Sequence, residues 1–136
     1  MKNGGMKNDS VAIGIIGAGI MGERLLNAIL QQDPALVRAC GLWDPAPEAM
    51  RRMAKAFPQV PQLVDAASVI AASDCTYIAS PPASHLEHAR AALAAGKSVF
   101  CEKPLAVDVA DARAFVAEAG NRGAVNFPFA SSPAVT

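Results

Sequence analysis

The stretch IIGAGIMG, residues 15–22, decides the fold. An apolar run ends in three glycines with the spacing G-x-G-x-x-G, and an apolar helical pattern follows. Between a strand and a helix, the first glycine permits a tight turn, the second lets a pyrophosphate approach the backbone, and the third lets the helix pack closely. The free N–H groups and the positive end of the helix then attract the phosphates. The sequence therefore predicts a dinucleotide-binding loop made of Gly17, Ala18, Gly19, Ile20, Met21 and Gly22.

Short β-rich runs alternate with helical stretches along the whole chain. The pattern predicts strands at 11–16, 36–43, 62–64, 75–79, 98–101 and 124–127, and helices at 22–31, 47–57, 66–72, 85–95 and 108–119. Strict alternation means parallel pairing with right-handed crossovers. The predicted fold class is therefore α/β, a doubly wound parallel Rossmann sheet of six strands in the order 3-2-1-4-5-6.

The composition fits one globular domain, since 52% of the 136 residues are hydrophobic and 18% are charged. Twelve Lys and Arg residues balance twelve Asp and Glu residues, with no basic stripe, which argues against a nucleic-acid partner. The apolar run at 11–21 is interrupted by glycines and is too short to span a membrane, so no membrane association is expected. We expect a disordered tail at residues 1–9 and a dinucleotide-binding domain at residues 10–128.

The three cysteines are Cys40, Cys75 and Cys101, an odd number without a C-x-x-C pair. Each lies in a predicted strand, which indicates buried reduced thiols and a reducing compartment. We therefore expect a cytoplasmic protein.

Asp44 ends the second predicted strand, 22 residues after Gly22. A carboxylate at this point accepts hydrogen bonds from the adenosine ribose hydroxyls and repels a 2′-phosphate, which favours NAD over NADP. The competing feature is the pair Arg51-Arg52, which could reach a 2′-phosphate from the following helix. The sequence thus predicts NAD as the cofactor, with NADP the less favoured alternative.

A second stretch, YIASPPASHLEHARAALAAGKSVFCEKPLA at residues 77–106, resembles the signature of the Gfo/Idh/MocA oxidoreductases, the family of glucose–fructose oxidoreductase and inositol dehydrogenase. The shared pattern is an aliphatic strand, S/T-P-P, a His, an Ala-rich helix and G-K-x-V-x-x-E-K-P. The resemblance implies an NAD(P)-dependent oxidoreductase that transfers a hydride between the nicotinamide and the CH–OH group of a sugar, inositol or related polyol. It further implies cofactor-binding roles for Ser80, Pro81, Pro82, His85, Glu102 and Lys103.

Lys103 is the expected catalytic residue. Removal of a hydride from a carbon that bears a hydroxyl requires the hydroxyl proton to be taken or shared, and a Lys of lowered pKa can do this. No metal site is expected, because His85 and His88 have no third ligand nearby in the sequence. Glu23 and Glu87 are expected to be solvated surface charges.

Members of the family usually carry a second α/β domain with most of the substrate pocket and the dimer interface. Residues 129–136 are therefore expected to begin a linker to such a domain. We expect the 136-residue chain to be inactive alone and monomeric, and longer relatives to form homo-oligomers. The alternative that remains open is a non-catalytic NAD-binding sensor or partner-binding module.

Overall fold

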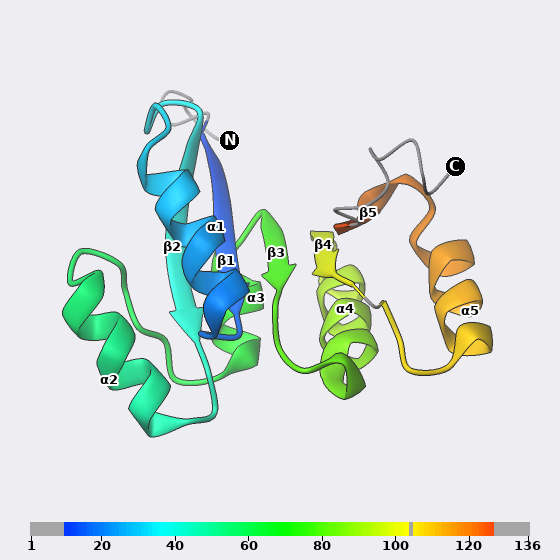
Figure 1. Ribbon diagram of the computed structural model, residues 1–136. Coiled ribbons are helices and arrows are strands. Elements are labelled where there is room, and N and C mark those ends of the chain that lie inside the picture. Colours follow the sequence, from blue (N-terminus) through cyan, green and yellow to red (C-terminus); the bar gives the residue numbers. More distant parts are fainter. Residues whose placement is uncertain (1–9, 104, 127–136) are drawn as a thin grey trace, which may run out of the picture.

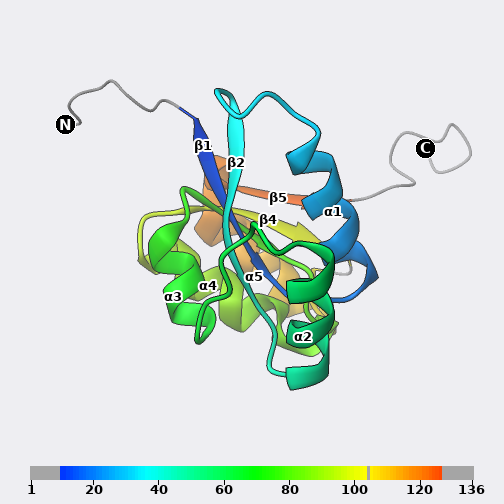
Figure 2. The same ribbon diagram turned by 90° about the vertical axis from the view of Figure 1, so that its left-hand side faces the viewer.

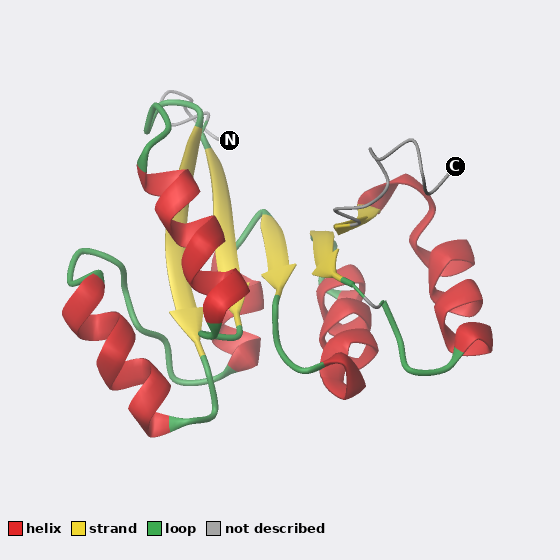
Figure 3. Cartoon of the chain, in the orientation of Figure 1, coloured by secondary structure: helices red, strands yellow, loops and turns green. Residues whose placement is uncertain are grey.

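A computed structural model describes residues 10–103 and 105–126, which form one parallel sheet with helices on both faces (Figures 1 and 3). The sheet has five strands in the order β2-β1-β3-β4-β5, and each neighbouring pair is parallel. The strands are β1 (Val11–Ile16), β2 (Val37–Trp43), β3 (Cys75–Ile78), β4 (Ser98–Glu102) and β5 (Gly123–Asn126). The predicted α/β class and parallel sheet are confirmed.

The helices connect successive strands. They are α1 (Ile20–Leu30), α2 (Pro47–Ala56), α3 (Ala66–Ala72), α4 (His85–Ala94) and α5 (Val109–Ala119), with short 3-10 turns η1 (Pro82–Ser84) and η2 (Gly120–Arg122). Helices α1 and α2 lie on one face of the sheet, and α3 and α4 lie on the other (Figure 2). No helix within the described ranges is long and apolar enough to cross a membrane.

The predicted strand at 62–64 is wrong, so the described sheet has five strands and not six. The segment forms only an isolated bridge between Leu42 and Gln62, flanked by hydrogen bonds from Leu42 N to Pro61 O (3.0 Å) and from Leu63 N to Leu42 O (2.9 Å). Pro61 has no N–H to extend this pairing. Asp65, three residues after Gln62, already accepts from Ser68 N as the N-cap of α3. The remaining five strands keep the predicted order.

Other boundaries differ less. Helix α1 begins at Ile20 inside the glycine motif, two residues before the prediction, because Gly19 itself is the N-cap. Residue 127 of the last predicted strand, the tail at 1–9 and the linker at 129–136 lie outside the described residues.

The core has two layers because β1 is buried on both faces. Ile15 and Ile16 are consecutive and both have no exposed surface, since their side chains point to opposite faces. On one face the apolar cluster includes Leu26 and Met53 from α1 and α2. On the other, residues of α3, α4 and α5 pack together around Ile16.

Leu26 tests this packing against a matched position on the same helix. Its side chain is fully buried, whereas that of Leu30 is 39% exposed. We expect Leu26→Ala to lower the free energy of unfolding by about 2–5 kcal/mol and Leu30→Ala by less than about 1 kcal/mol. Urea unfolding followed by the fluorescence of the single tryptophan, Trp43, measures both. Equal losses for the two variants would contradict the packing described.

Candidate dinucleotide-binding site

Four chain segments that carry predicted site residues meet at one edge of the sheet. Because the strands are parallel, their carboxyl ends point the same way (Figures 1 and 3). The register aligns Ile16 with Trp43 and with Ile78, and Ile78 with Cys101. The glycine loop, Asp44, the Ser-Pro-Pro segment and the Glu-Lys pair therefore follow these strands at the same level. This edge is where ligands bind in open α/β sheets.

Two of the three glycines are required by the fold. Gly17 has φ +109°, and a Cβ added there would lie 2.5 Å from the carbonyl carbon of Ala79. A Cβ on Gly22 would lie 2.1 Å from the carbonyl oxygen of Gly17. Any side chain at either position would therefore force β1, β3 and α1 apart.

Gly19 is different. Its φ is −87°, a value that any residue adopts, and a Cβ built on it would have no atom within 4 Å. It is the N-cap of α1, and no side chain caps this helix end. The next residue, Ile20, has 72% of its surface exposed. The start of α1 thus offers unpaired helix N–H groups beside bare backbone, which is a geometry suited to an anion.

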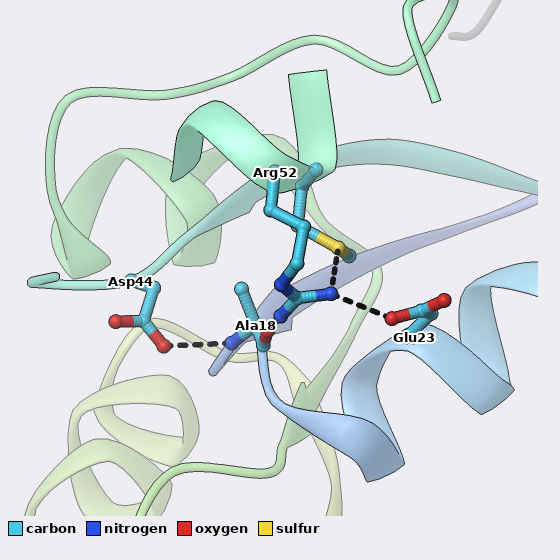
Figure 4. Close-up of polar contacts among 5 residues, drawn as sticks. Ala18, Glu23, Asp44 and Arg52 are labelled. Carbon is cyan, nitrogen blue, oxygen red and sulfur yellow. Dashed lines mark hydrogen bonds and ion pairs between the residues drawn. The ribbon is translucent and has the colours of Figure 1, made fainter. Parts of the chain in front are cut away.

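Asp44 joins the end of β2 to the glycine loop. Its Oδ2 accepts a hydrogen bond from Ala18 N (2.8 Å; Figure 4). Its Oδ1 accepts one from Ala46 N (2.8 Å). An ionised carboxylate offers about four lone-pair positions, so each oxygen keeps capacity for a ligand hydroxyl. The predicted Asp44 is therefore placed next to the loop, half-buried and anchored on both oxygens.

Arg52, on α2, reaches across to the same loop (Figure 4). Its Nη1 lies 2.7 Å from Glu23 Oε1 on α1, and its Nη2 donates a hydrogen bond to the carbonyl oxygen of Ala18. Glu23 is a surface charge, as expected, with 39% of its side chain exposed, and it is also ion-paired with Arg52. The sequence could not reveal this pair because its members are 29 residues apart.

The Ser-Pro-Pro segment leaves β3 and turns into α4. Ser84 Oγ donates to Pro81 O (2.8 Å) and lies 2.7 Å from Ser80 Oγ. His85 Nε2 lies 2.5 Å from Ser80 O, and because a carbonyl only accepts, Nε2 carries the hydrogen. His85 is 1% exposed, so its side chain contacts the Ser-Pro-Pro segment from the protein interior. Pro81 and Pro82 are exposed on the outer side.

At the end of β4, Glu102 and Lys103 differ sharply in exposure. Glu102 is 6% exposed and accepts a hydrogen bond from the hydroxyl of the buried Tyr77, while Lys103 is exposed. The Tyr77 and Phe100 rings also pack together, with centroids 5.3 Å apart. Tyr77 was not singled out from the sequence. Its position depends on the strand register, which pairs Tyr77 with Phe100. Glu102 follows Phe100 by two residues, so its side chain lies on the same face of the sheet as Tyr77.

An apolar hollow lies away from these residues. A groove of about 340 Å³ between α3 and α4 is lined mainly by alanines, with Glu87 and His88 at its side, and contains none of the predicted site residues. A second hollow of about 440 Å³ adjoins Pro82 and is lined also by Leu86 and Val107. No three His, Cys, Asp or Glu residues in ranges 10–103 and 105–126 are grouped so that they could hold a metal ion.

The Tyr77–Glu102 contact predicts a loss of stability at high pH. Burial, and then the hydrogen bond and charge of Glu102, raise the pKa of Tyr77 above its ordinary value of 10.0, and burial raises the pKa of Cys101 to about 12. Above about pH 9–10 the unfolded chain has therefore released protons that the folded chain keeps, so the free energy of unfolding falls as the pH rises.

Tyr77 is the single tyrosine, so tyrosinate absorbance reports on it alone. We expect this absorbance to appear together with the loss of far-UV circular dichroism in an alkaline titration. Ionisation of Tyr77 near pH 10 in a chain that retains its native dichroism would contradict the buried pair.

Comparison with known proteins places the chain in a family. Residues 11–128 match the family GFO_IDH_MocA, described as "Oxidoreductase family, NAD-binding Rossmann fold". The chain is 32% identical over 118 residues to inositol 2-dehydrogenase 3 of Saccharopolyspora erythraea, with 84% of the chain and 34% of that protein covered. It is 37% identical over 117 residues to inositol 2-dehydrogenase of Cereibacter sphaeroides, with the same coverage. The chain therefore spans about a third of the length of these curated relatives.

Solved structures contain a domain with the same fold. GenD2 from gentamicin A biosynthesis, in complex with NAD, matches with a TM-score of 0.79 and 25% identity over 94% of the chain and 37% of that structure. Scyllo-inositol dehydrogenase from Lactobacillus casei, with bound NAD(H) and scyllo-inositol, matches with a TM-score of 0.74 and 26% identity over 87% of the chain and 36% of that structure. Together with the glycine loop and Asp44, these matches show that the chain belongs to the Gfo/Idh/MocA family of oxidoreductases and comprises the family's NAD-binding Rossmann domain.

Proposed function

We propose that the carboxyl edge of the sheet binds NAD. The observation that supports this proposal most directly is the glycine at position 19. The fold gives no reason for glycine at this position, because φ is ordinary and a Cβ would meet no protein atom. A ligand whose pyrophosphate lies against the backbone supplies that reason. The first N–H groups of α1 would bind the phosphate oxygens, with the helix dipole favouring their charge.

Asp44 supports NAD in preference to NADP. Its carboxylate is fixed by Ala18 N and Ala46 N, so it cannot turn away from a ligand without breaking two hydrogen bonds. The free lone pairs would accept from the ribose hydroxyls, while its charge would repel a 2′-phosphate. Arg52, one of the two arginines that could have favoured NADP, already contacts Glu23 and Ala18.

The catalytic half of the proposal concerns Lys103. It follows β4 directly and is exposed at the same edge as the glycine loop. A bound nicotinamide supplies the hydride acceptor. The Lys103 amine would take or share the proton of the substrate hydroxyl, and the neighbouring Ser80, Pro81 and Pro82 would line the nicotinamide half of the cofactor.

Two buried contacts would hold these groups in place. His85 fixes the carbonyl of Ser80, and Tyr77 fixes the carboxylate of Glu102, which immediately precedes Lys103. His85 would then act from beneath the Ser-Pro-Pro segment and not by direct contact with the cofactor. Because reaction rates depend on sub-ångström placement of donor and acceptor, both contacts matter for turnover.

A polyol is the proposed substrate class of the whole enzyme, with the chain providing its cofactor-binding part. Support comes from the relatives named inositol 2-dehydrogenase and from the neighbour solved with scyllo-inositol. Substrate contacts from a further domain of about twice this length would complete the site, so turnover by the 136-residue chain alone is expected to be negligible. The three free cysteines support a reducing, cytoplasmic location.

Titration with NADH and NADPH tests the proposal. We expect calorimetry to show NADH binding with a dissociation constant about tenfold or more below that of NADPH, because Asp44 opposes the 2′-phosphate. Asp44→Asn is expected to shrink this difference about tenfold, and Glu48→Gln, which removes an exposed charge from α2, to leave it unchanged. Absence of NADH binding would refute the proposal, and a preference for NADPH would refute its assignment of Asp44.

A further inference from the structure

Ala18 is held by one carboxylate and one guanidinium, and a second carboxylate, that of Glu23, holds the guanidinium. Asp44 accepts from the N–H of Ala18, and Arg52 donates to its carbonyl oxygen (Figure 4). Within the described residues, Arg52 forms its ion pair with Glu23 and not with Asp44. We call Glu23, Arg52 and the Ala18 carbonyl the loop clasp.

The loop clasp fixes the orientation of a peptide group in the glycine motif. The peptide between Ala18 and Gly19 is planar, and its C=O and N–H point in opposite directions. Arg52 holds the C=O, so the direction of the Gly19 N–H is set as well. With Ala18 N taken by Asp44, the Gly19 N–H is the first donor of the motif left for a phosphate.

The loop clasp also balances charge at this corner. The Arg52 and Glu23 side chains are 50% and 39% exposed, and a solvent-exposed pair of this kind adds little to folding stability. Its 2.7 Å contact nevertheless places a negative charge beside the guanidinium that contacts the loop. An uncompensated guanidinium at this position would attract a 2′-phosphate, a group that carries close to two negative charges at neutral pH.

We propose that Glu23 is a second determinant of dinucleotide selectivity, which acts by holding Arg52 on the Ala18 carbonyl and withholding its charge from a 2′-phosphate. Asp44 discriminates by direct repulsion, and Glu23 acts through Arg52. Arg52 is then a positioning residue for the pyrophosphate loop in the wild-type chain, and becomes a phosphate-binding residue only when Glu23 is neutralised. This inference rests on the proposed NAD-binding function.

Glu23→Gln is the first test, since Gln removes the charge and keeps the shape. We expect the ratio of the NADPH to the NADH dissociation constant to fall about fivefold, mainly because NADPH binds more tightly. The gain in NADPH affinity should shrink in about 0.5 M salt, because salt screens the attraction between Arg52 and the 2′-phosphate. Glu48→Gln on α2 is the control for loss of an exposed carboxylate. A ratio in Glu23→Gln equal to that in Glu48→Gln would overturn the inference.

Arg52→Gln separates the loop clasp from a direct phosphate receptor. We expect the affinities for NADH and NADPH to fall together, about fivefold, because the pyrophosphate loop that both ligands share is loosened. Lys55→Gln, one turn further along α2, controls for loss of a cation from the same helix. Weakened NADPH binding with unchanged NADH binding would show instead that Arg52 binds the 2′-phosphate in the wild-type chain, which contradicts the proposal.

The double variant Glu23→Gln/Arg52→Gln completes the cycle. If Glu23 acts through Arg52, neutralising Glu23 changes the ratio in the wild-type background and not in the Arg52→Gln background. An equal change in both backgrounds would mean that Glu23 repels the phosphate directly, and would overturn the inference. Failure of the wild-type chain to bind NADH would instead refute the underlying function, so the two failures are distinguishable.

Discussion

The approach of Gly22 to the carbonyl oxygen of Gly17 is the constraint on which the site depends. No side chain fits between them, since a Cβ on Gly22 would lie 2.1 Å from that oxygen. Helix α1 therefore begins directly against the end of β1, with its axis and its N-terminal dipole fixed relative to the sheet. Gly17 is held in turn by a hydrogen bond from its N–H to the carbonyl of Trp43 (2.9 Å), which ties the loop to β2.

The polar contacts around the loop extend this constraint to the neighbouring strands. Asp44 connects the loop to β2, and Arg52 connects it to both α1 and α2. On the other side of the edge, His85 and Tyr77 hold the backbone of Ser80 and the carboxylate of Glu102 from within the protein. In each case a buried or hydrogen-bonded side chain fixes a backbone group or a carboxylate at this edge, an arrangement that suits a ligand-binding edge with little need for rearrangement.

Much of this could be predicted from sequence because it is local. The alternation of strands and helices predicts the parallel sheet, and the glycine spacing predicts the loop, because each pattern lies in a continuous stretch of sequence. Asp44 is predicted from its place at the end of the second strand, 22 residues after Gly22. The strand at 62–64 was over-predicted because Pro61 and Asp65 restrict it to one bridge, and that restriction depends on the hydrogen bonds each makes.

The contacts that position the site could not be found in this way. Tyr77 and Glu102 are 25 residues apart, and Glu23 and Arg52 are 29 apart, so each pair depends on sheet register or helix packing. Likewise, the family resemblance implies a cofactor-binding role for His85, whereas its burial against Ser80 depends on the turn η1 that precedes α4.

Replacement of Gly19 by Ala, with stability and NADH affinity measured on the same sample, tests the central claim most directly. Gly96→Ala is the matched comparison, because it too has no atom within 4 Å of an added Cβ but has φ +81° at the end of α4. We predict that Gly19→Ala weakens NADH binding more than about tenfold and costs less than about 1 kcal/mol of stability, because the added methyl meets only the ligand. Gly96→Ala should cost about 1–2 kcal/mol and leave NADH affinity unchanged. Unchanged NADH affinity in Gly19→Ala would contradict the account, because the bare backbone at Gly19 would then have no ligand to accommodate.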